Sequence, residues 1–296
     1  MLETRNLTHL FGPGQGIQDL DLVVRTGEIF GFLGPNGAGK STTINLLIDF
    51  LRPQAGWISL LGVLLREGGP ALRARIGFLP GELRLPPDLT GTQALIFLER
   101  LTRRPARLRD AVIERLGLRS VDLAKPLRDC SHGTRQRIGL VQAFQHDPEL
   151  LILDEPTTGL DPLMQAAFEE LLAWTRARGR TVFLSSHNLR EVERTCDRVA
   201  IVRQSRLVAV ESVETLAARA LRRVAAEWAG PTAALPDWPG VETVVLEPGR
   251  LELLVPPALL PPVLRWLAQR EIRDLTCERA SLEDLFLGYY REATTA

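Results

Sequence analysis

Residues 34–41 read Gly-Pro-Asn-Gly-Ala-Gly-Lys-Ser, which matches the pattern G-x-x-x-x-G-K-S between an apolar run and a helical segment. The three glycines of this pattern allow the backbone N–H groups and the helix start to face a phosphate. Lys40 can then reach the β- and γ-phosphates, and Ser41 can offer its hydroxyl to magnesium. A glycine turn with an exposed lysine is the alternative, but the pattern arises by chance in roughly one chain in a hundred of this length. The residues predicted to contact a nucleotide here are Gly34, Pro35, Asn36, Gly37, Ala38, Gly39, Lys40, Ser41 and Thr42.

Two acids end the apolar run Leu-Leu-Ile-Leu-Asp-Glu-Pro at 150–156. A continuous apolar run of this kind is typical of a buried parallel strand, and open α/β sheets bind ligands at the carboxyl ends of such strands. Asp154 is suited to hold a magnesium shell, and Glu155 to orient or deprotonate an attacking water. The alternative is that the two acids only cap the next turn. Because a phosphate loop precedes them in the chain, this is the weaker interpretation.

A histidine follows the next apolar run, in Ser-Ser-His-Asn-Leu at 185–189. A lone histidine is usually structural. The position of His187, at the end of the strand after the two acids, instead favours a role near the γ-phosphate, where it would polarise or hold the attacking water. Lys40, Glu155 and His187 are therefore the candidate catalytic residues.

The elements that must position these residues alternate between strands and helices. Short strands broken by Gly-rich turns occupy about the first forty residues, and a strand, the phosphate loop and a helix follow. After a second strand-rich stretch and a short strand at 74–80, apolar residues at i, i+3 and i+4 predict helices within 81–146. Strands and helices alternate again from 149 to about 205, which predicts an α/β core with a parallel sheet, flanking helices and an inserted helical subdomain.

The composition shifts after about residue 205. A linker-like segment covers 230–240, a hairpin is predicted over 241–256, a helix over 262–270 and a terminal amphipathic helix over 281–292. We therefore expect two domains, residues 1–210 with the site and residues 211–296 as a small α+β accessory domain.

The charge balance limits the choice of partner. The 296 residues carry 36 Lys+Arg and 36 Asp+Glu, and lysine occurs only at Lys40 and Lys125. A neutral chain without clusters of basic residues lacks the positive charge that binds nucleic-acid phosphates. No nucleic-acid partner is therefore expected. The three cysteines are far apart, which indicates neither a zinc knuckle nor a disulfide framework. No apolar run approaches the roughly 20 residues of a membrane-spanning helix.

The combined motifs resemble the ATP-binding subunit of an ABC transporter. They are the segments already described together with Gly-Leu-Asp at 159–161 and Cys-Ser-His-Gly-Thr-Arg-Gln-Arg at 130–137. The resemblance implies a P-loop NTPase core, the cofactors ATP and Mg²⁺, and a head-to-tail homodimer at the cytoplasmic face of a membrane, attached to a separately encoded permease. It also implies that Phe11 stacks on adenine, that Ser131 and Gly133 contact the γ-phosphate across the dimer, and that Asp161 links the two sites.

The finer pattern resembles exporter-type subunits. The segments 76–91, 135–164 and 282–290 carry this likeness. It makes export the expected direction.

Two departures from the family pattern stand out. The family usually has glutamine after the strand at 76–80, where this chain has Gly81 followed by Glu82, so either Glu82 replaces it at the metal or the site relies on Ser41 and water. The family signature Leu-Ser-Gly-Gly-Gln is replaced by residues 130–134, Cys-Ser-His-Gly-Thr. Ser131 can cap the helix that follows, and an uncompleted helix N-terminus is a phosphate receptor.

Three functions remain open from the sequence. The first is a transport ATPase that drives export through a separate membrane protein. The second is a non-transport ABC ATPase of DNA maintenance or translation, whose usual coiled-coil insertions, zinc cysteines or basic linkers are not found in these 296 neutral residues. The third is a regulatory ATP clamp with little turnover, which the altered signature permits and which Glu155 and His187 disfavour.

Overall fold

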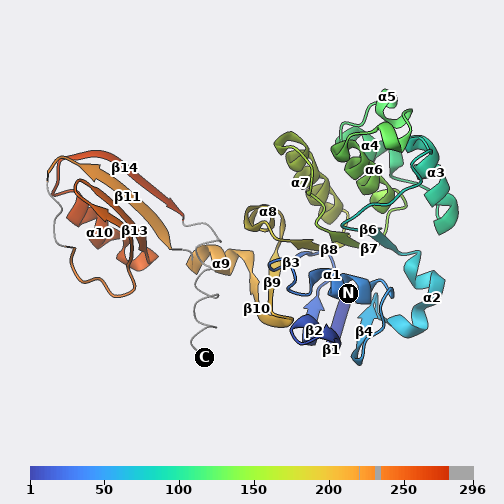
Figure 1. Cartoon of the computed structure of the whole chain (residues 1–296), viewed down its shortest axis with the longest axis horizontal. Helices are drawn as coiled ribbons and strands as arrows, with labels where there is room; N and C mark the ends of the chain where they lie inside the picture. Colours follow the sequence, from blue (N-terminus) through green and yellow to red (C-terminus); the bar gives the residue numbers. More distant parts are fainter. Residues whose placement is uncertain (220, 231–234, 280–296) are drawn as a thin grey trace. The chain divides into compact units, whose positions relative to one another are not determined.

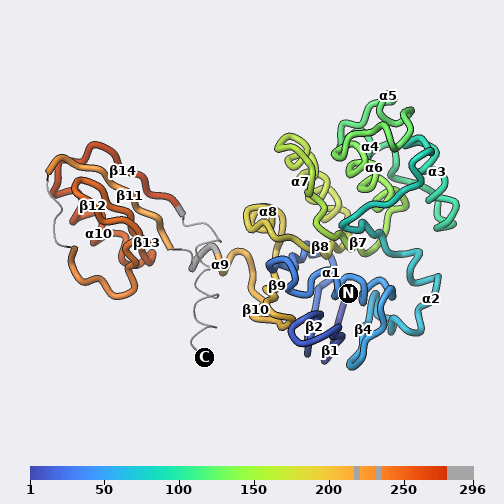
Figure 2. The backbone as a smooth tube through the Cα atoms, viewed as in Figure 1, coloured from blue at the N-terminus to red at the C-terminus, as the bar shows by residue number. Residues whose placement is uncertain are grey.

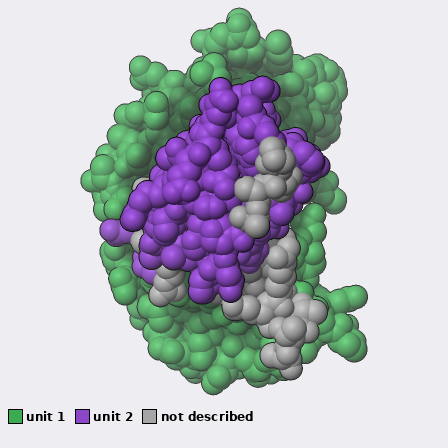
Figure 3. All heavy atoms as spheres, turned by 90° about the vertical axis from the view of Figure 1, so that its left-hand side faces the viewer, with its two compact units in different colours: residues 1–211 green, residues 212–296 purple. Residues whose placement is uncertain are grey.

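The computed structural model describes residues 1–219, 221–230 and 235–279 (Figure 1). It divides into two compact units, residues 1–211 and 212–296, which are coloured separately in Figure 3. Each unit is described by itself. The terminal amphipathic helix predicted over 281–292, and the exporter-like segment 282–290 within it, lie outside the described residues.

The first unit begins with an antiparallel sheet of order β2-β1-β4-β5. Alternating burial along β1 and β2 packs one face on the core, where Leu2, Leu7 and Ile17 are fully buried. The strands are β1 (Leu2–Gly12), β2 (Gln15–Val24), β4 (Ala55–Leu60) and β5 (Val63–Leu64).

A second, six-stranded sheet has the order β10-β9-β3-β8-β7-β6, and the five strands from β9 to β6 run parallel. Every residue of β3, β7 and β8 is buried, as apolar strands covered on both faces require. The strands are β3 (Ile29–Leu33), β6 (Ile76–Leu79), β7 (Leu150–Asp154), β8 (Thr181–Ser186), β9 (Arg198–Arg203) and β10 (Arg206–Ser212). The parallel α/β core predicted from the sequence is confirmed.

Helix α1 (Lys40–Leu47) follows β3 and leads to β4 of the first sheet, while α7 (Pro162–Ala177) connects β7 to β8 and α8 (Leu189–Thr195) connects β8 to β9. The chain between β6 and β7 forms a separate group of helices, drawn in teal and green in Figures 1 and 2. They are α3 (Gly91–Thr102), α4 (Arg109–Arg115), α5 (Ser120–Leu123) and α6 (His132–Phe144), with a 3₁₀ turn at Leu127–Asp129.

The helix α2 (Leu65–Arg73) was not predicted. It follows β5 and is interrupted at Gly69, where φ is 53° and ψ is −155°. Two glycines and a proline at 68–70 are typical of a turn. Because Leu65 and Leu72 are buried, packing against the core overrides that local preference.

The second unit contains a four-stranded sheet of order β12-β13-β11-β14, with antiparallel neighbours throughout. Its core joins the apolar face of the sheet to Val263 and Leu267 of the helix α10. The elements are α9 (Val213–Arg219), β11 (Arg222–Trp228), β12 (Glu242–Glu247), β13 (Arg250–Val255), a 3₁₀ turn at Pro257–Leu259, α10 (Leu260–Leu267) and β14 (Ile272–Arg279). The predicted hairpin and helix are both present.

No helix among the described residues has the length and apolar character needed to cross a membrane.

Candidate functional site

The carboxyl ends of three neighbouring strands bring the predicted catalytic residues together. Leu33 at the end of β3 pairs with Ser186 of β8, and Asp154 at the end of β7 pairs with Ser185 of β8. The phosphate loop, the two acids and His187 follow these positions directly, so the parallel register places them at one edge of the sheet. We call this set, with Ser185 included, the sheet-edge site.

The phosphate loop turns tightly into α1. Gly39 is the N-cap residue, with φ of 107°, and a Cβ at this position would collide with the carbonyl oxygen of Gly16. Only glycine fits there. The Lys40 side chain is buried and its Nζ donates to the carbonyl oxygens of Gly34, at 2.7 Å, and Pro35, at 3.3 Å. The Ser41 side chain is exposed in the first turn of the helix.

Ser185 holds the two acids in place. Its Oγ donates to Asp154 Oδ1 at 2.5 Å and accepts the Glu155 backbone N–H at 3.0 Å. Glu155 has a φ of 47°, in the left-handed region that side chains other than glycine rarely adopt. Such strain persists at functional sites when neighbouring contacts hold it. Here Ser185 supplies such a contact by accepting the Glu155 N–H.

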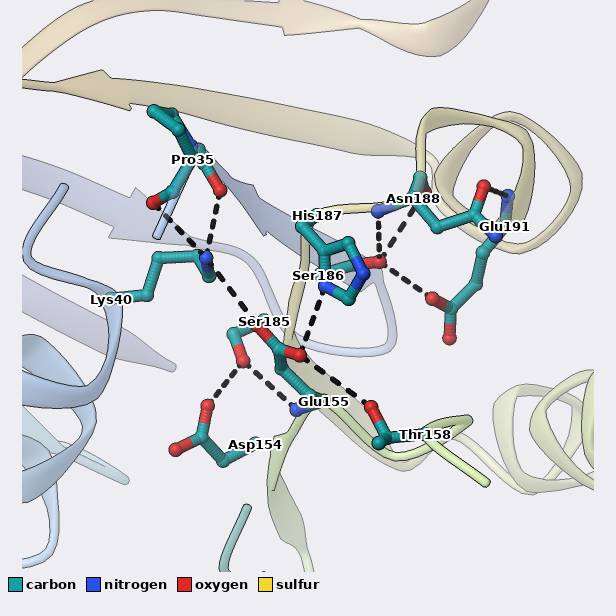
Figure 4. Close-up of polar contacts among 11 residues, drawn as sticks. Pro35, Lys40, Asp154, Glu155, Thr158, Ser185, Ser186, His187, Asn188 and Glu191 are labelled. Atoms are coloured by element: carbon teal, nitrogen blue, oxygen red, sulfur yellow. Dashed lines mark hydrogen bonds and ion pairs between the residues drawn. The ribbon is translucent and has the colours of Figure 1, made fainter. Parts of the chain in front are cut away.

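The Glu155 carboxylate has partners from three directions (Figure 4). Its Oε1 lies 3.4 Å from Lys40 Nζ, and its Oε2 lies 2.9 Å from His187 Nδ1. The Thr158 hydroxyl donates to Oε2 at 3.5 Å. The three predicted catalytic residues are therefore in direct contact. Lys40 and Glu155 form a partly buried ion pair at the point where the sequence predicts the γ-phosphate.

The loop after β6 lies against Asp154. A Cβ at Gly81 would be 3.2 Å from Asp154 Oδ2, so the glycine leaves space beside that oxygen. Glu82, predicted as a metal ligand, has a 76% exposed side chain and accepts a hydrogen bond from Arg84 at 2.8 Å. This guanidinium lowers the pKa of the Glu82 carboxyl. The structure thus gives Glu82 a different partner from the Asp154 shell expected from the sequence.

The segment at the start of α6 is capped as predicted. Ser131 Oγ accepts the Thr134 N–H at 3.2 Å and donates to Thr134 Oγ1 at 2.9 Å, and the side chains of Ser131 and His132 are exposed. We call Ser131, His132 and Gly133 the receptor segment. It sits on a helix of 13 residues with no acid in its first turn, so its N-terminus is electropositive.

The receptor segment packs against the loop that follows Glu155 in the same chain. Gly159 has φ of 79°, and a Cβ there would collide with the His132 imidazole ring. The buried Gln136 side chain donates from Nε2 to the Pro156 carbonyl oxygen at 3.0 Å. The exposed His132 ring, an oddity of the sequence, therefore fills the space that a side chain at 159 would take.

Two predicted contacts lie farther from the sheet edge. Phe11 on β1 is 63% exposed and packs edge-to-face with His9, with ring centroids 4.8 Å apart. One face of its ring is thus open to a planar ligand. Asp161 caps α7 by accepting the Met164 N–H at 2.9 Å. Neither residue contacts the sheet-edge site within the described chain.

Comparison with known proteins agrees with this geometry. The family model described as ABC transporter matches residues 17–158. A fluoroquinolones export ATP-binding protein of Mycobacterium tuberculosis is 37% identical, with 97% of this chain and 92% of that protein covered. The chain belongs to the ABC transporter family.

Other relatives of this ABC chain carry similar descriptions. The Nod factor export ATP-binding protein I of Cupriavidus pinatubonensis is 38% identical over 71% of this chain, and the chain spans 65% of that protein's length. A solved ATP-binding subunit of an ABC transporter is 30% identical with a TM-score of 0.67, covering 73% of this chain and 91% of that one. A dimeric bacterial ABC transporter cassette, at 21% identity and a TM-score of 0.66, shows the same fold. The predicted family and fold class are confirmed.

Three residues of the site were not predicted from the sequence. Ser185 and Gln136 form the buried hydrogen bonds described above, and Glu191 in the first turn of α8 is a buried acid. The Ser-Ser pair before His187 was a usable signal for Ser185. The sequence has no comparable signal for Gln136 and Glu191, because polar residues on amphipathic helices are normally assigned to the exposed face.

Proposed function

We propose that this chain binds ATP with Mg²⁺, hydrolyses it in a head-to-tail homodimer, and drives export through a separate integral membrane permease. The observation that carries the proposal is the contact of Glu155 with both Lys40 and His187 at the end of the strands. A carboxylate, a lysine and a histidine in contact beside a phosphate loop suit a phosphoryl-transfer site, which needs positioning and charge stabilisation above all.

The roles of these residues follow from their contacts. An incoming γ-phosphate competes with Glu155 for Lys40, because both are anions within reach of one ammonium group. Glu155, released from Lys40 and still held at Oε2 by His187, then accepts a proton from the attacking water. His187 orients that carboxylate and polarises the water. Phe11 stacks on the adenine ring.

The residues at the sheet edge fit a magnesium ion. Asp154 is buried and Ser185 occupies only its Oδ1, while the glycine at 81 leaves space beside Oδ2. Together with the exposed Ser41 hydroxyl, this gives two oxygen ligands, as is usual where magnesium keeps its waters and bridges substrate phosphates. In the described part of the chain no three acidic, histidine or cysteine side chains form a ready cage. When bound, the ion would neutralise charge on the β- and γ-phosphates.

The homodimer is proposed from the receptor segment. Ser131 is exposed at an electropositive helix end, and its contacts lie within α6 and not at the sheet-edge site of its own chain. Ser131 and Gly133 would therefore bind the γ-phosphate held by a second copy, with Asp161 at the contact between the two sites.

Export and the membrane partner are proposed from relatives. The Mycobacterium and Cupriavidus proteins are described as export ATP-binding proteins, and the first spans both units of this chain. A separate permease at the cytoplasmic face of the membrane follows from that similarity. The sequence gives no basis for preferring DNA maintenance or a low-turnover clamp.

The test is phosphate release by the purified chain, with and without Mg²⁺, together with size-exclusion chromatography in ATP. We expect slow turnover that EDTA abolishes and a shift from monomer to dimer only when ATP is present. Turnover that persists in EDTA would contradict the metal assignment, and a chain that binds ATP without releasing phosphate would support the clamp. Co-purification with the membrane protein encoded beside it tests the partner, and a DNA-processing neighbour would contradict it.

A further inference from the structure

The sheet-edge site has a buried acid behind it that the proposed reaction does not yet use. Glu191 is only 6% exposed, although glutamate is almost never buried without a partner. Its Oε2 accepts the Ser186 hydroxyl at 2.6 Å. Its Oε1 is buried and forms no hydrogen bond of normal geometry within the described chain, although the Thr157 hydroxyl also acts on this carboxylate. A buried carboxyl oxygen without such a bond is rare and requires an explanation.

Glu191 and Glu155, both labelled in Figure 4, line the same cavity of about 280 Å³. The turn at 186–188 and the loop that starts at Thr157 also line it. Glu191 Oε1 is itself shielded from solvent, so the acid is connected to Glu155 through the turn that carries His187.

The other carboxyl oxygen fixes the turn that carries His187. The Ser186 hydroxyl accepts the Asn188 N–H at 2.9 Å and also lies 3.3 Å from the Asn188 carbonyl oxygen. Because this hydroxyl closes the turn and bonds to Glu191, the acid holds the turn from its buried side. His187 lies at the middle of that turn and contacts Glu155 at 2.9 Å.

We propose that Glu191 is a positioning residue for ATP hydrolysis, which holds the Ser186–Asn188 turn and thereby places His187 against Glu155. The inference rests on the proposed ATPase function. Glu191 does not touch the nucleotide. It acts through His187 and Glu155, and it keeps the histidine at the distance at which the carboxylate can be oriented.

The groups around Glu191 affect the pKa of its carboxyl. Burial raises the pKa of its carboxyl, and the nearby Glu155 adds to that effect. The Ser186 and Thr157 hydroxyls and the His187 ring act in the opposite direction. Burial also raises the pKa of the Cys196 thiol, on the same helix, to about 12, so this thiol stays neutral. Glu191 therefore ionises at a higher pH than a free glutamate and then adds a negative charge beside Glu155.

The first experiment compares kcat and the KM for ATP in E191L and S186A. We expect kcat to fall roughly tenfold to a hundredfold in E191L, because a misplaced catalytic group has such effects. S186A is expected to lower kcat in the same direction, and the KM for ATP is expected to stay within about twofold in both. The matched control is E193L, two residues along the same helix, which should keep the wild-type kcat.

The second experiment uses E191Q, which keeps the shape and the acceptor for Ser186 and cannot ionise. We expect E191Q to retain much more activity than E191L. Recovery of kcat in the conservative variant, with the KM for ATP unchanged, is a result that a general loss of packing would not produce.

These measurements separate the inference from the proposed function. A wild-type kcat in E191L, or a kcat in E191Q as low as that of E191L, would overturn the role of Glu191 provided that E155Q abolishes turnover in the same assay. If E155Q retains full turnover, the proposed ATPase site itself is wrong. If E191L does not fold, S186A and E191Q carry the decision.

Discussion

The sheet-edge site and the receptor segment differ in how many of their polar groups find hydrogen-bond or ion-pair partners within this chain. At the sheet edge, Lys40, Asp154 and Glu155 each have polar partners within the chain at 2.5–3.5 Å. The receptor segment is exposed, and its hydrogen bonds serve only to cap its own helix. In the proposed homodimer, this chain would preorganise one half of an ATP site and present the other half to a second copy.

The largest effect is expected at the sheet edge. Glu155→Gln removes the proton acceptor and keeps the shape, so kcat should fall about 10²- to 10⁴-fold. ATP binding should remain, and the ATP-bound dimer should accumulate in size-exclusion chromatography. Phosphate release in single turnover measures the loss. Unchanged turnover would show that another group activates the water.

An intermediate effect is expected in the receptor segment. Ser131→Ala should lower kcat roughly tenfold, because one charge-assisted hydrogen bond to the γ-phosphate is lost. ATP binding to the monomer, measured by equilibrium titration, should be unchanged. This change also removes a helix cap, which costs about 1 kcal/mol of stability.

Thr90→Ala is the matched control for that cost. Thr90 caps α3 by accepting the Gln93 N–H at 3.2 Å, far along the chain from either half of the site. Its loss should reduce the melting temperature about as much as Ser131→Ala and leave turnover unaffected. If both variants reduce turnover equally, the receptor segment is no more than a helix start.

A smaller effect is expected at Glu82. Its side chain is exposed, like the receptor segment, but it already has a charged partner, Arg84, like the residues of the sheet-edge site. Arg84 lowers the pKa of this carboxyl, so Glu82 stays ionised to a lower pH than a free glutamate. If Glu82 serves the metal, Glu82→Ala should raise the Mg²⁺ concentration for half-maximal turnover a few-fold at neutral pH. Arg84→Ala, which frees the carboxylate, should not raise it. Equal magnesium titrations for Glu82→Ala and wild type would contradict a metal role.

The smallest effect is expected for His132→Gly, which restores the family residue. The His132 ring packs on Gly159. Within the described residues, it forms no hydrogen bond with Glu155. We expect kcat and the KM for ATP to change less than about threefold. A larger change, or an altered pH dependence of turnover, would give His132 a direct part in phosphate binding.

The sequence was sufficient to predict the sheet, the phosphate loop and the meeting of Lys40, Glu155 and His187. This succeeded because parallel strands end at one edge, so residues that directly follow apolar runs come together. Their individual roles remain predictions until the variants above are measured.

Two of the polar residues that support this site could not be predicted. Glu191 lies on a short helix and Gln136 on a helix of mixed polarity, and nothing local says that their polar atoms are buried. Burial depends on which faces meet in three dimensions. Glu82 is an exposed residue whose partner was also not predicted. The family pattern suggested a metal ligand at this position, but the nearby Arg84 pairs with the carboxylate.

The ring of His132 over Gly159 restricts how this chain can change over generations. A side chain at 159 has no room while the imidazole stays in place, and the left-handed backbone adds its own barrier. Movement or loss of the ring removes the first barrier and leaves the second, so glycine is expected to persist at 159 even beside a smaller residue at 132. Two positions that the sequence separates by 27 residues are thus coupled through one van der Waals contact.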